Sequence, residues 1–156
     1  MAKPSLDAPG VIIFPPFLWL ITVGVGVAAH YLAPVPLTPA GGWRLAGTAL
    51  VLAAGGNALW ARAQMVRAGT NVNPGKPATA IVTGGPYRFT RNPMYLSLCT
   101  LNLGIGLWMR DLTPVALTLA FAAVLQFGVI KREERYLEAK FGEVYTNYRR
   151  RVRRWL

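Results

Sequence analysis

The hydrophobic pattern of this chain is clearest in residues 91–135, RNPMYLSLCTLNLGIGLWMRDLTPVALTLAFAAVLQFGVIKREER. Two apolar runs, residues 94–109 and 112–130, are separated only by a short polar turn that contains Asp111. Each run comes close to the roughly 17–25 residues that a membrane-spanning helix needs. Because the turn is so short, the two runs are predicted to form an antiparallel helical hairpin whose open end lies at residues 91–93 and 131–135.

Two further apolar runs, residues 11–32 and 43–65, precede the hairpin, and a proline-rich connector joins them. The small residues Ala53-Ala54-Gly55-Gly56 are expected to let a neighbouring helix approach closely. Asn57 is expected either to form a hydrogen bond between helices or to line a cavity. The overall composition, 53% hydrophobic, agrees with a membrane protein. The N-terminus does not resemble a cleaved signal peptide, so the first run is expected to remain in the protein. The sequence therefore predicts an all-α polytopic membrane protein with about four transmembrane helices, in a single domain over residues 1–156.

The two segments outside the apolar runs are predicted to carry the activity. Residues 67–93 are rich in glycine, proline and asparagine and are long for a simple connection, so we expect this loop to be packed and functional. In residues 131–156 apolar side chains recur at helical spacing, with an interruption expected at Gly142. Such amphipathic helices could lie on the membrane surface or fold back over the loop.

The net charge of +11, with 17 basic and 6 acidic residues, indicates a partner that is anionic. Together with the apolar runs, this charge favours a membrane lipid surface over nucleic acid. In a four-helix topology only Arg44 and Arg110 fall on one side, and every other lysine and arginine falls on the opposite side. The positive-inside rule then places both termini and the long loop in the cytosol, in the cytoplasmic (inner) membrane. The arginines of residues 149–154 are expected mainly to attract lipid phosphates.

A metal site is not expected, because the chain has one cysteine and one histidine far apart in the sequence. The residues that could bind a ligand or catalyse a reaction instead lie at the open end of the hairpin. Asn92 and Pro93 fit the cap and first turn of a helix, and Arg88 and Arg91 beside that helix start could hold an anion. The hairpin also brings Glu133 and Glu134 near Arg91. One glutamate is predicted to form a partly buried ion pair with Arg91 while the other faces a ligand.

Two segments of the C-terminal half carry a family resemblance. The segment GPYRFTRNPMYLS resembles the Arg-His-Pro-x-Tyr-apolar-Gly motif of membrane-embedded methyltransferases. The segment EERYLEAKFGEVYTNYRRRVRRWL is similar to their second signature, which has a Glu-Glu pair, Phe-Gly, spaced tyrosines and a basic Arg-Trp end. The superfamily includes isoprenylcysteine carboxyl methyltransferases and phospholipid N-methyltransferases. The resemblance covers residues 84–156.

The resemblance implies S-adenosylmethionine as the methyl donor. Its carboxylate suits an arginine, its amino group and ribose hydroxyls suit a carboxylate, and its sulfonium suits an aromatic face. The candidate catalytic residues are Arg91, Glu133 and Glu134. The candidate cofactor-binding residues are Tyr87, Arg88, Arg91, Asn92, Pro93, Tyr95, Glu133 and Glu134.

The sequence departs from the family pattern at two positions. Asn92 stands where the family usually has histidine, and Ser97 where it has glycine. Asparagine can donate a hydrogen bond but cannot act as an acid or base near neutral pH. The acceptor is expected to be a lipid-like or isoprenylcysteine-like molecule that enters laterally from the membrane, and an amine acceptor would need a base such as Glu133 or Glu134.

Two alternative functions are also compatible with these sequence features. A membrane reductase could bind the 2′-phosphate of a nicotinamide cofactor with a basic cluster made of Arg88, Arg91, Arg149, Arg150 and Arg151. A non-enzymatic membrane scaffold could use the basic tail to bind anionic lipid. The glycine- and proline-rich loop and the paired glutamates argue against the scaffold, which has no evident need for either.

Overall fold

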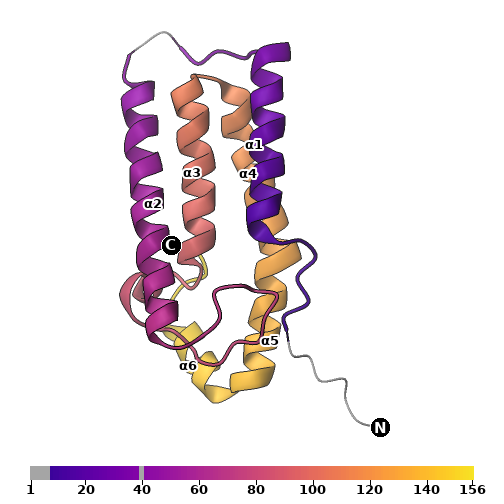
Figure 1. Ribbon diagram of the computed structural model, residues 1–156, viewed down its shortest axis with the longest axis vertical. Helices are drawn as coiled ribbons and strands as arrows, with labels where there is room; N and C mark the ends of the chain where they lie inside the picture. The colour runs from indigo at the N-terminus through magenta and orange to yellow at the C-terminus, as the bar shows by residue number, and fades with distance from the viewer. Residues whose placement is uncertain (1–7, 39–40) are drawn as a thin grey trace.

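The computed structural model describes residues 8–38 and 41–156, and its long helices run side by side (Figure 1). They are α1 (Pro15–Leu32), α2 (Trp43–Arg67), α3 (Pro93–Met109) and α4 (Leu112–Leu125). These helices begin and end within a few residues of the four predicted apolar runs. Helix α3 packs between α2 and α4, and α1 packs mainly on α4. The described part of the chain contains no β-strand, so the all-α prediction is confirmed.

The helix that begins as α4 extends beyond the four-helix bundle. It continues through a π-helical turn, η2 (Gln126–Ile130), into α5 (Lys131–Phe141). A separate helix, α6 (Glu143–Arg151), follows after Gly142. Gly142 has a φ angle of +52°, which favours glycine and explains why the helix breaks there. The predicted interruption at Gly142 is therefore confirmed.

Helices α5 and α6 fold back over the long loop. Tyr145 and Tyr148 of α6 pack with Tyr87 of the loop and Ala61 of α2 in one buried cluster. Ile81 and Val82 of the loop, together with Leu137 and Phe141 of α5, pack around that cluster. Of the two positions considered for the amphipathic tail, the structure has the one over the loop, and the loop is packed as expected. Phe89 is the exception, since it is 67% exposed.

The closest helix contact lies between α2 and α3, but not where the sequence predicted it. A Cβ atom added to Gly47 would lie 2.6 Å from the carbonyl oxygen of Gly104, whereas Gly55 and Gly56 have no such neighbour within 4 Å. The predicted role of Gly55 and Gly56 is therefore wrong, although Ala54 is buried. The hydrogen bond predicted for Asn57 is confirmed, because its Nδ2 donates to the Pro93 carbonyl at 2.9 Å and to Ser97 Oγ at 2.8 Å.

Gly47→Ala is expected to lower the free energy of unfolding by about 1–3 kcal/mol, because the added methyl group must push α2 away from α3. Gly55→Ala on the same helix is the matched control. No atom would contact its methyl group, and alanine is the better helix former, so it should leave stability unchanged or raise it slightly. Unfolding in mixed detergent micelles measures both. Equal effects of the two substitutions would contradict the assignment of this contact to Gly47.

Two helices are long and apolar enough to cross a membrane. They are Pro15–Leu32 and the continuous helix Leu112–Phe141, which includes α4, the π-turn and α5. Helix α2 is long but contains more polar residues, and α3 has only 17 residues. Length and composition thus support two membrane spans among the described residues, and they do not confirm the predicted four.

Candidate active site

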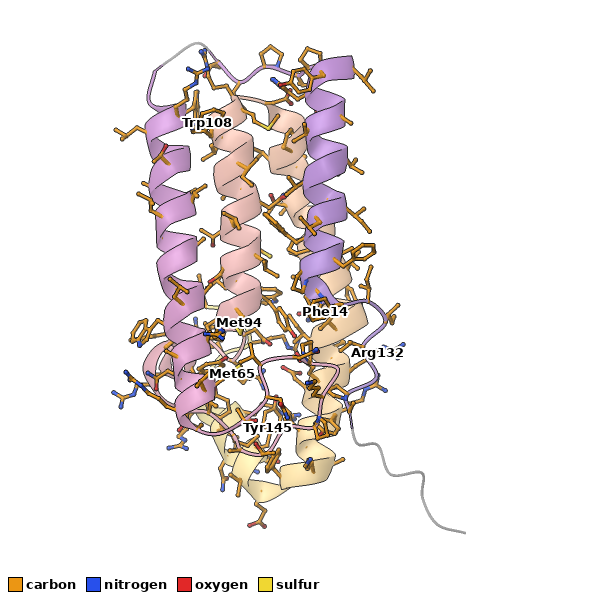
Figure 2. All side chains as sticks on the ribbon, viewed as in Figure 1. Phe14, Met65, Met94, Trp108, Arg132 and Tyr145 are labelled. Carbon is orange, nitrogen blue, oxygen red and sulfur yellow. The ribbon has the colours of Figure 1, made fainter. Side chains whose placement is uncertain are left out.

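A cavity of about 410 Å³ lies where the bundle meets the loop and the C-terminal helices. Figure 2 shows Phe14, Met65, Met94 and Tyr145 around this end of the molecule, and all four line the cavity. The volume falls in the range of small-molecule sites, roughly 300–1,000 Å³. The walls come from the start of α1, from α2 and α3, from the loop, and from α5 and α6, so distant parts of the sequence meet here.

The structure brings together seven of the eight residues predicted to form the site. The residues that line the cavity are Tyr87, Arg91, Asn92, Pro93, Tyr95, Glu133 and Glu134. Arg88 differs from them, because its side chain is exposed and does not line the cavity. It lies in the short 3₁₀ helix η1 (Gly85–Arg88), whose Tyr87 is buried. The tight turn directs the neighbouring side chains to different sides.

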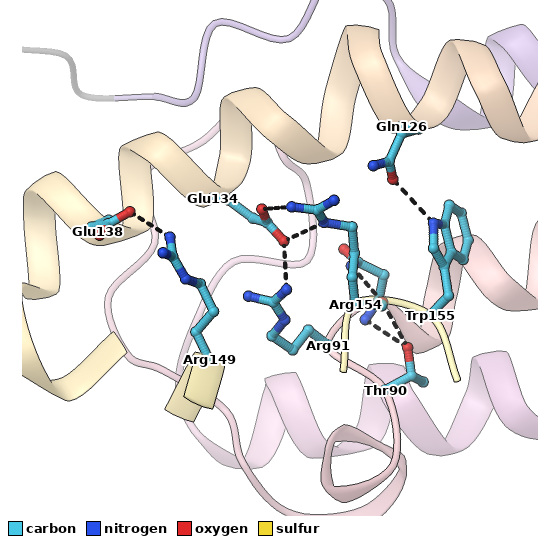
Figure 3. Close-up of polar contacts among 9 residues, drawn as sticks. Thr90, Arg91, Gln126, Glu134, Glu138, Arg149, Arg154 and Trp155 are labelled. Atoms are coloured by element: carbon cyan, nitrogen blue, oxygen red, sulfur yellow. Dashed lines mark hydrogen bonds and ion pairs between the residues drawn. The ribbon is translucent and has the colours of Figure 1, made fainter. Parts of the chain in front are cut away.

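Glu134 is the electrostatic centre of the site (Figure 3). Its Oε1 lies 3.1 Å from Nη2 of Arg91, and the exposed fractions of the two side chains are 10% and 9%. The predicted partly buried ion pair is therefore confirmed, with Glu134 as the partner. Arg154 adds a bidentate pair, in which Nε donates to Oε1 at 2.8 Å and Nη2 donates to Oε2 at 2.6 Å. Sequence reasoning assigned Arg154 to lipid attraction, and that assignment was wrong.

The segment after α6 is held against the start of α3. The carbonyl of Arg154 accepts hydrogen bonds from Thr90 Oγ1 at 3.0 Å and from Asn92 Nδ2 at 2.9 Å. The backbone N–H of Arg91 donates to the Arg153 carbonyl at 2.9 Å, and Trp155 Nε1 donates to Gln126 Oε1 at 3.0 Å. Asn92 does occupy the cap position of α3, but its side chain makes no capping hydrogen bond. Its amide instead fastens the C-terminal segment beside the cavity.

Arg91 has two buried donors that lack a partner with hydrogen-bond geometry, although the guanidinium also interacts with the Tyr145 phenol. Its Nε and Nη1 are inaccessible to solvent and lack hydrogen-bond partners among the described residues, while the side chain lines the cavity. An unsatisfied buried donor costs about 1–3 kcal/mol, and more when the group is charged. Glu134 already occupies Nη2, so Nε and Nη1 are the donors left for a carboxylate or another anion in the cavity. Because neither atom is open to solvent in this structure, the Arg91 side chain must shift to present them to such a ligand.

Glu133 has a different environment from Glu134. Its Oε1 accepts a hydrogen bond from the Tyr95 hydroxyl at 2.8 Å, and it lines the cavity. Burial raises the pKa of the Glu133 carboxyl to about 7; the Tyr95 hydrogen bond opposes that rise and the Glu134 charge adds to it. The two adjacent glutamates thus differ in role, since Glu134 balances two arginines while Glu133 can change its charge near neutral pH.

Several cavity residues were not assigned to the site from the sequence. Tyr145 and Tyr148 are among the side chains that recur at helical spacing in residues 131–156, and the sequence predicts no further role for them. Both line the cavity, and the Tyr148 hydroxyl donates to the Tyr87 carbonyl at 2.8 Å. Burial raises the pKa of the Tyr145 phenol to about 12, so it remains protonated. Asn71, Asn73 and Lys76 of the loop also line the cavity. The signal available in the sequence was the loop's unusual length and polarity, which did not specify residues.

The sequence profile of the phospholipid methyltransferase family matches residues 43–144. The chain belongs to the phospholipid methyltransferase family. The match begins at the start of α2 and ends just inside α6, so it includes the ion pair of Arg91 with Glu134 and the Tyr95–Glu133 hydrogen bond. Membership in this methyltransferase family supports an enzyme associated with a membrane, and it favours the methyltransferase hypothesis over the reductase and the scaffold.

Three relatives of this phospholipid methyltransferase family member are informative. A 63-residue stretch is 43% identical to a Haemophilus influenzae protein described as uncharacterized, and it covers all of that protein and 40% of this chain. The cobalt-zinc-cadmium resistance protein CzcN of Cupriavidus metallidurans is 37% identical over 79 residues. The nickel-cobalt-cadmium resistance protein NccN of Alcaligenes xylosoxydans xylosoxydans is 31% identical over 78 residues. Each of these two alignments covers 50% of this chain but only 36% of the resistance protein.

The names of the two resistance proteins refer to metals, whereas the described residues of this family member offer no metal centre. Across residues 8–38 and 41–156, no three His, Cys, Asp or Glu side chains gather closely enough to hold a metal ion. The acidic groups of the cavity are instead engaged with arginine and tyrosine.

Proposed function

We propose that this protein is an S-adenosylmethionine-dependent methyltransferase that acts on a lipid-like or isoprenylcysteine-like acceptor at the cytosolic face of the membrane. The observation that carries the proposal is the pair of unsatisfied, buried Arg91 donors in a cavity that also contains Glu133. A cavity with one anion-binding face and one carboxyl matches a zwitterionic ligand that also carries a positive sulfur.

The residues present fit this cofactor. Nε and Nη1 of Arg91 would hold its carboxylate, and Glu133 would accept hydrogen bonds from its amino group or hydroxyls. The faces of buried tyrosines such as Tyr87 and Tyr145 would attract its positive charge. When bound, the cofactor supplies an electrophilic methyl group for transfer. Glu134 and Arg154 hold Arg91 in place, so Arg154 is a positioning residue rather than a catalytic one.

The acceptor is proposed to reach the cavity from the bilayer. Helices α1 and α2 are not neighbours in the bundle, and the apolar cavity residues Phe14, Pro15, Ala58 and Leu98 come from α1, α2, α3 and the segment just before α1. Phe14 is 46% exposed at this rim. An apolar wall open toward the lipid suits an acyl or prenyl chain, with the nucleophilic head group directed to the polar end of the cavity. Glu133 is the group proposed to take a proton from an amine acceptor.

We further propose that α2 and α3 cross the membrane together with α1 and α4. Exposed apolar residues recur every seventh position along α2, namely Leu45, Leu52, Leu59 and Val66, and the first three are 76%, 71% and 69% exposed. Such a stripe along the whole helix is unfavourable in water and favourable against lipid. The polar residues Asn57 and Asn102 face the bundle interior, where both find hydrogen-bond partners.

The proposed orientation follows from charge. The cavity, the loop and α5 and α6 lie at the end that carries nearly all lysines and arginines, while Arg44 and Arg110 mark the other end. The positive-inside rule places the cavity on the cytosolic side of the inner membrane. Residues 1–7, whose cytosolic position was predicted with the N-terminus, lie outside the described residues.

The proposal is tested by incubating the purified protein in lipid vesicles with S-adenosylmethionine labelled on its methyl group and a total lipid extract. Label is expected in a lipid fraction, and mass spectrometry of that fraction identifies the acceptor. Equilibrium binding of S-adenosylmethionine and of a nicotinamide dinucleotide is measured in parallel. Tight binding of the dinucleotide without binding of S-adenosylmethionine would overturn the proposal in favour of the reductase.

Affinity for S-adenosylmethionine is expected to rise with pH across neutrality, because the Glu133 carboxyl has a pKa of about 7. Below that pH the carboxyl is mostly neutral, and above it the negative charge attracts the cationic ligand. Between about pH 6 and pH 8 the affinity should increase, by at most about tenfold per pH unit, and then level off. Calorimetric titration measures this and the proton released on binding.

Glu133→Gln should bind more weakly and lose the rise with pH. Glu143→Gln, which changes an exposed glutamate of α6, should keep the wild-type profile. Affinity that falls as pH rises, or a Glu133→Gln profile equal to that of the wild type, would show that Glu133 does not face the cofactor.

A further inference from the structure

The α1–α2 connector and the α3–α4 turn lie at the end of the bundle opposite α5 and α6 (Figure 1). A second polar hollow lies where residues of this connector and this turn meet. Its volume is about 280 Å³, and its charged or titratable lining residues are His30, Arg44, Arg110 and Asp111. None of these residues belongs to the proposed methyl-transfer site. They come from α1, from the start of α2 and from the turn, so the hollow exists only in the folded bundle.

The carboxylate of Asp111 is satisfied within the protein. Asp111 is fully buried, with His30 Nδ1 2.9 Å from its Oδ2. The backbone N–H groups of Thr113 and Val35 donate to it at 2.8 and 3.3 Å. Two backbone hydrogen bonds join the connector to the turn, from Leu37 N to the Arg110 carbonyl at 2.9 Å and from Leu112 N to the Val35 carbonyl at 2.8 Å. These hydrogen bonds hold the connector and the turn together at the wall of the hollow. The Asp111 carboxylate is the one carboxylate that lines the hollow, and it already interacts with His30, Val35 and Thr113.

The two arginines of the hollow are left without a counter-charge. Both side chains are exposed, and within the described ranges no carboxylate forms an ion pair with either of them. Arg44 lies over the Trp108 ring, with 5.6 Å from its guanidinium carbon to the ring centre, which fixes its position. Arg110 has a φ angle of +60° and is the one non-glycine residue in this region of backbone space in the part of the chain that the structure describes. A glycine would adopt that conformation with less strain than this arginine does.

We propose that this hollow is a binding site for a phosphate-type anion, held by the guanidinium groups of Arg44 and Arg110. Arginine suits such a ligand because its planar fork donates two hydrogen bonds to phosphate oxygens. In the proposed topology the hollow lies at the membrane boundary of the face away from methyl transfer. The same chemistry is offered there by the head group of an anionic phospholipid and by free phosphate.

The test measures thermal unfolding of the full chain in phosphatidylcholine nanodiscs, because a ligand that binds only the folded state raises the midpoint. In one arm inorganic phosphate is titrated against chloride at equal ionic strength. In the other arm phosphatidylglycerol replaces part of the phosphatidylcholine. Arg44→Gln and Arg110→Gln remove the two guanidiniums separately. Arg62→Gln is the matched control, since it changes an exposed arginine near the opposite end of α2.

The wild type and Arg62→Gln are expected to show a higher midpoint in at least one arm, and each hollow variant should bind about tenfold more weakly or worse. A rise with inorganic phosphate identifies a free anion, and a rise with phosphatidylglycerol alone identifies a lipid head group. No rise in either arm, or a rise that both hollow variants retain, would overturn the proposal. Methyl transfer is not measured, so failure of this proposal would leave the proposed methyl transfer untouched.

Discussion

Replacing Glu134 with alanine is expected to lower the free energy of unfolding by about 3–5 kcal/mol, because it strands two arginines, one of them buried. Arg91 and Arg154 both depend on this carboxylate, whose side chain is only 10% exposed (Figure 3). Arg154 also lies in the segment that is fastened to Thr90 and Asn92, so losing the ion pairs should loosen that segment as well. Unfolding in mixed detergent micelles measures the change.

Glu138→Ala is the matched control for this experiment. Glu138 lies one helical turn further along α5 and also pairs with an arginine, Arg149, at 2.7 Å, but both of these side chains are 43% exposed. An exposed pair contributes at most about 1 kcal/mol, so the control should stay near wild-type stability. If Glu134→Ala lost no more than Glu138→Ala, burial would not distinguish the two ion pairs.

Arg91→Ala is expected to weaken S-adenosylmethionine binding by about a hundredfold or more, because it removes the buried donors proposed to hold the cofactor carboxylate. Its effect on stability should be smaller than that of Glu134→Ala, since Glu134 keeps its bidentate partner Arg154. Arg91→Lys keeps the positive charge without the planar donor fork. Most of the binding loss should therefore remain in the lysine variant.

Arg150→Ala serves as the control for Arg91, because Arg150 is exposed on α6 and does not line the cavity. It should bind the cofactor like the wild type. Calorimetric titration at fixed salt measures all of these variants. Full recovery of affinity in Arg91→Lys would mean that charge alone, and not the two unsatisfied nitrogens, holds the ligand.

The sequence predicted the helices and the Arg91 ion pair for one shared reason. Apolar runs fix where long helices lie, and the two-residue turn Arg110-Asp111 forces two of them into a hairpin, so the groups at its open end must meet. That geometry does not depend on how side chains pack. The Gly47–Gly104 contact does depend on side-chain packing, because the rotation of α2 about its axis decides which small residues face α3. Polar and apolar residues are spread around all sides of α2, so the sequence does not indicate that rotation.

The position of Arg154 could not be predicted from the sequence, because it depends on the direction that the backbone takes after α5 and α6. Hydrophobic spacing does not determine that direction. Arg154 follows the helix break at Gly142 and the extended residue Val152, and each changes the direction of the chain. A basic tail beside a membrane also has an obvious role in attracting lipid, and five arginines of equal charge give no sign of which one turns inward. For the same reason Asn92 was placed correctly as a cap residue while the partner of its side chain was not foreseen.

The π-turn at Gln126–Ile130 changes the direction in which side chains point along one continuous helix. It allows α4 and α5 to face different neighbours. Successive α-helical residues are separated by about 100° around the axis, so one extra residue in a turn shifts the phase of everything that follows by that amount. Above the turn, the phase of α4 suits its neighbours α1 and α3; below it, the phase of α5 directs Glu133 and Glu134 toward the cavity. A single-residue deletion in this turn would leave both halves helical and every side chain of the cavity present, while rotating the acidic pair away from Arg91.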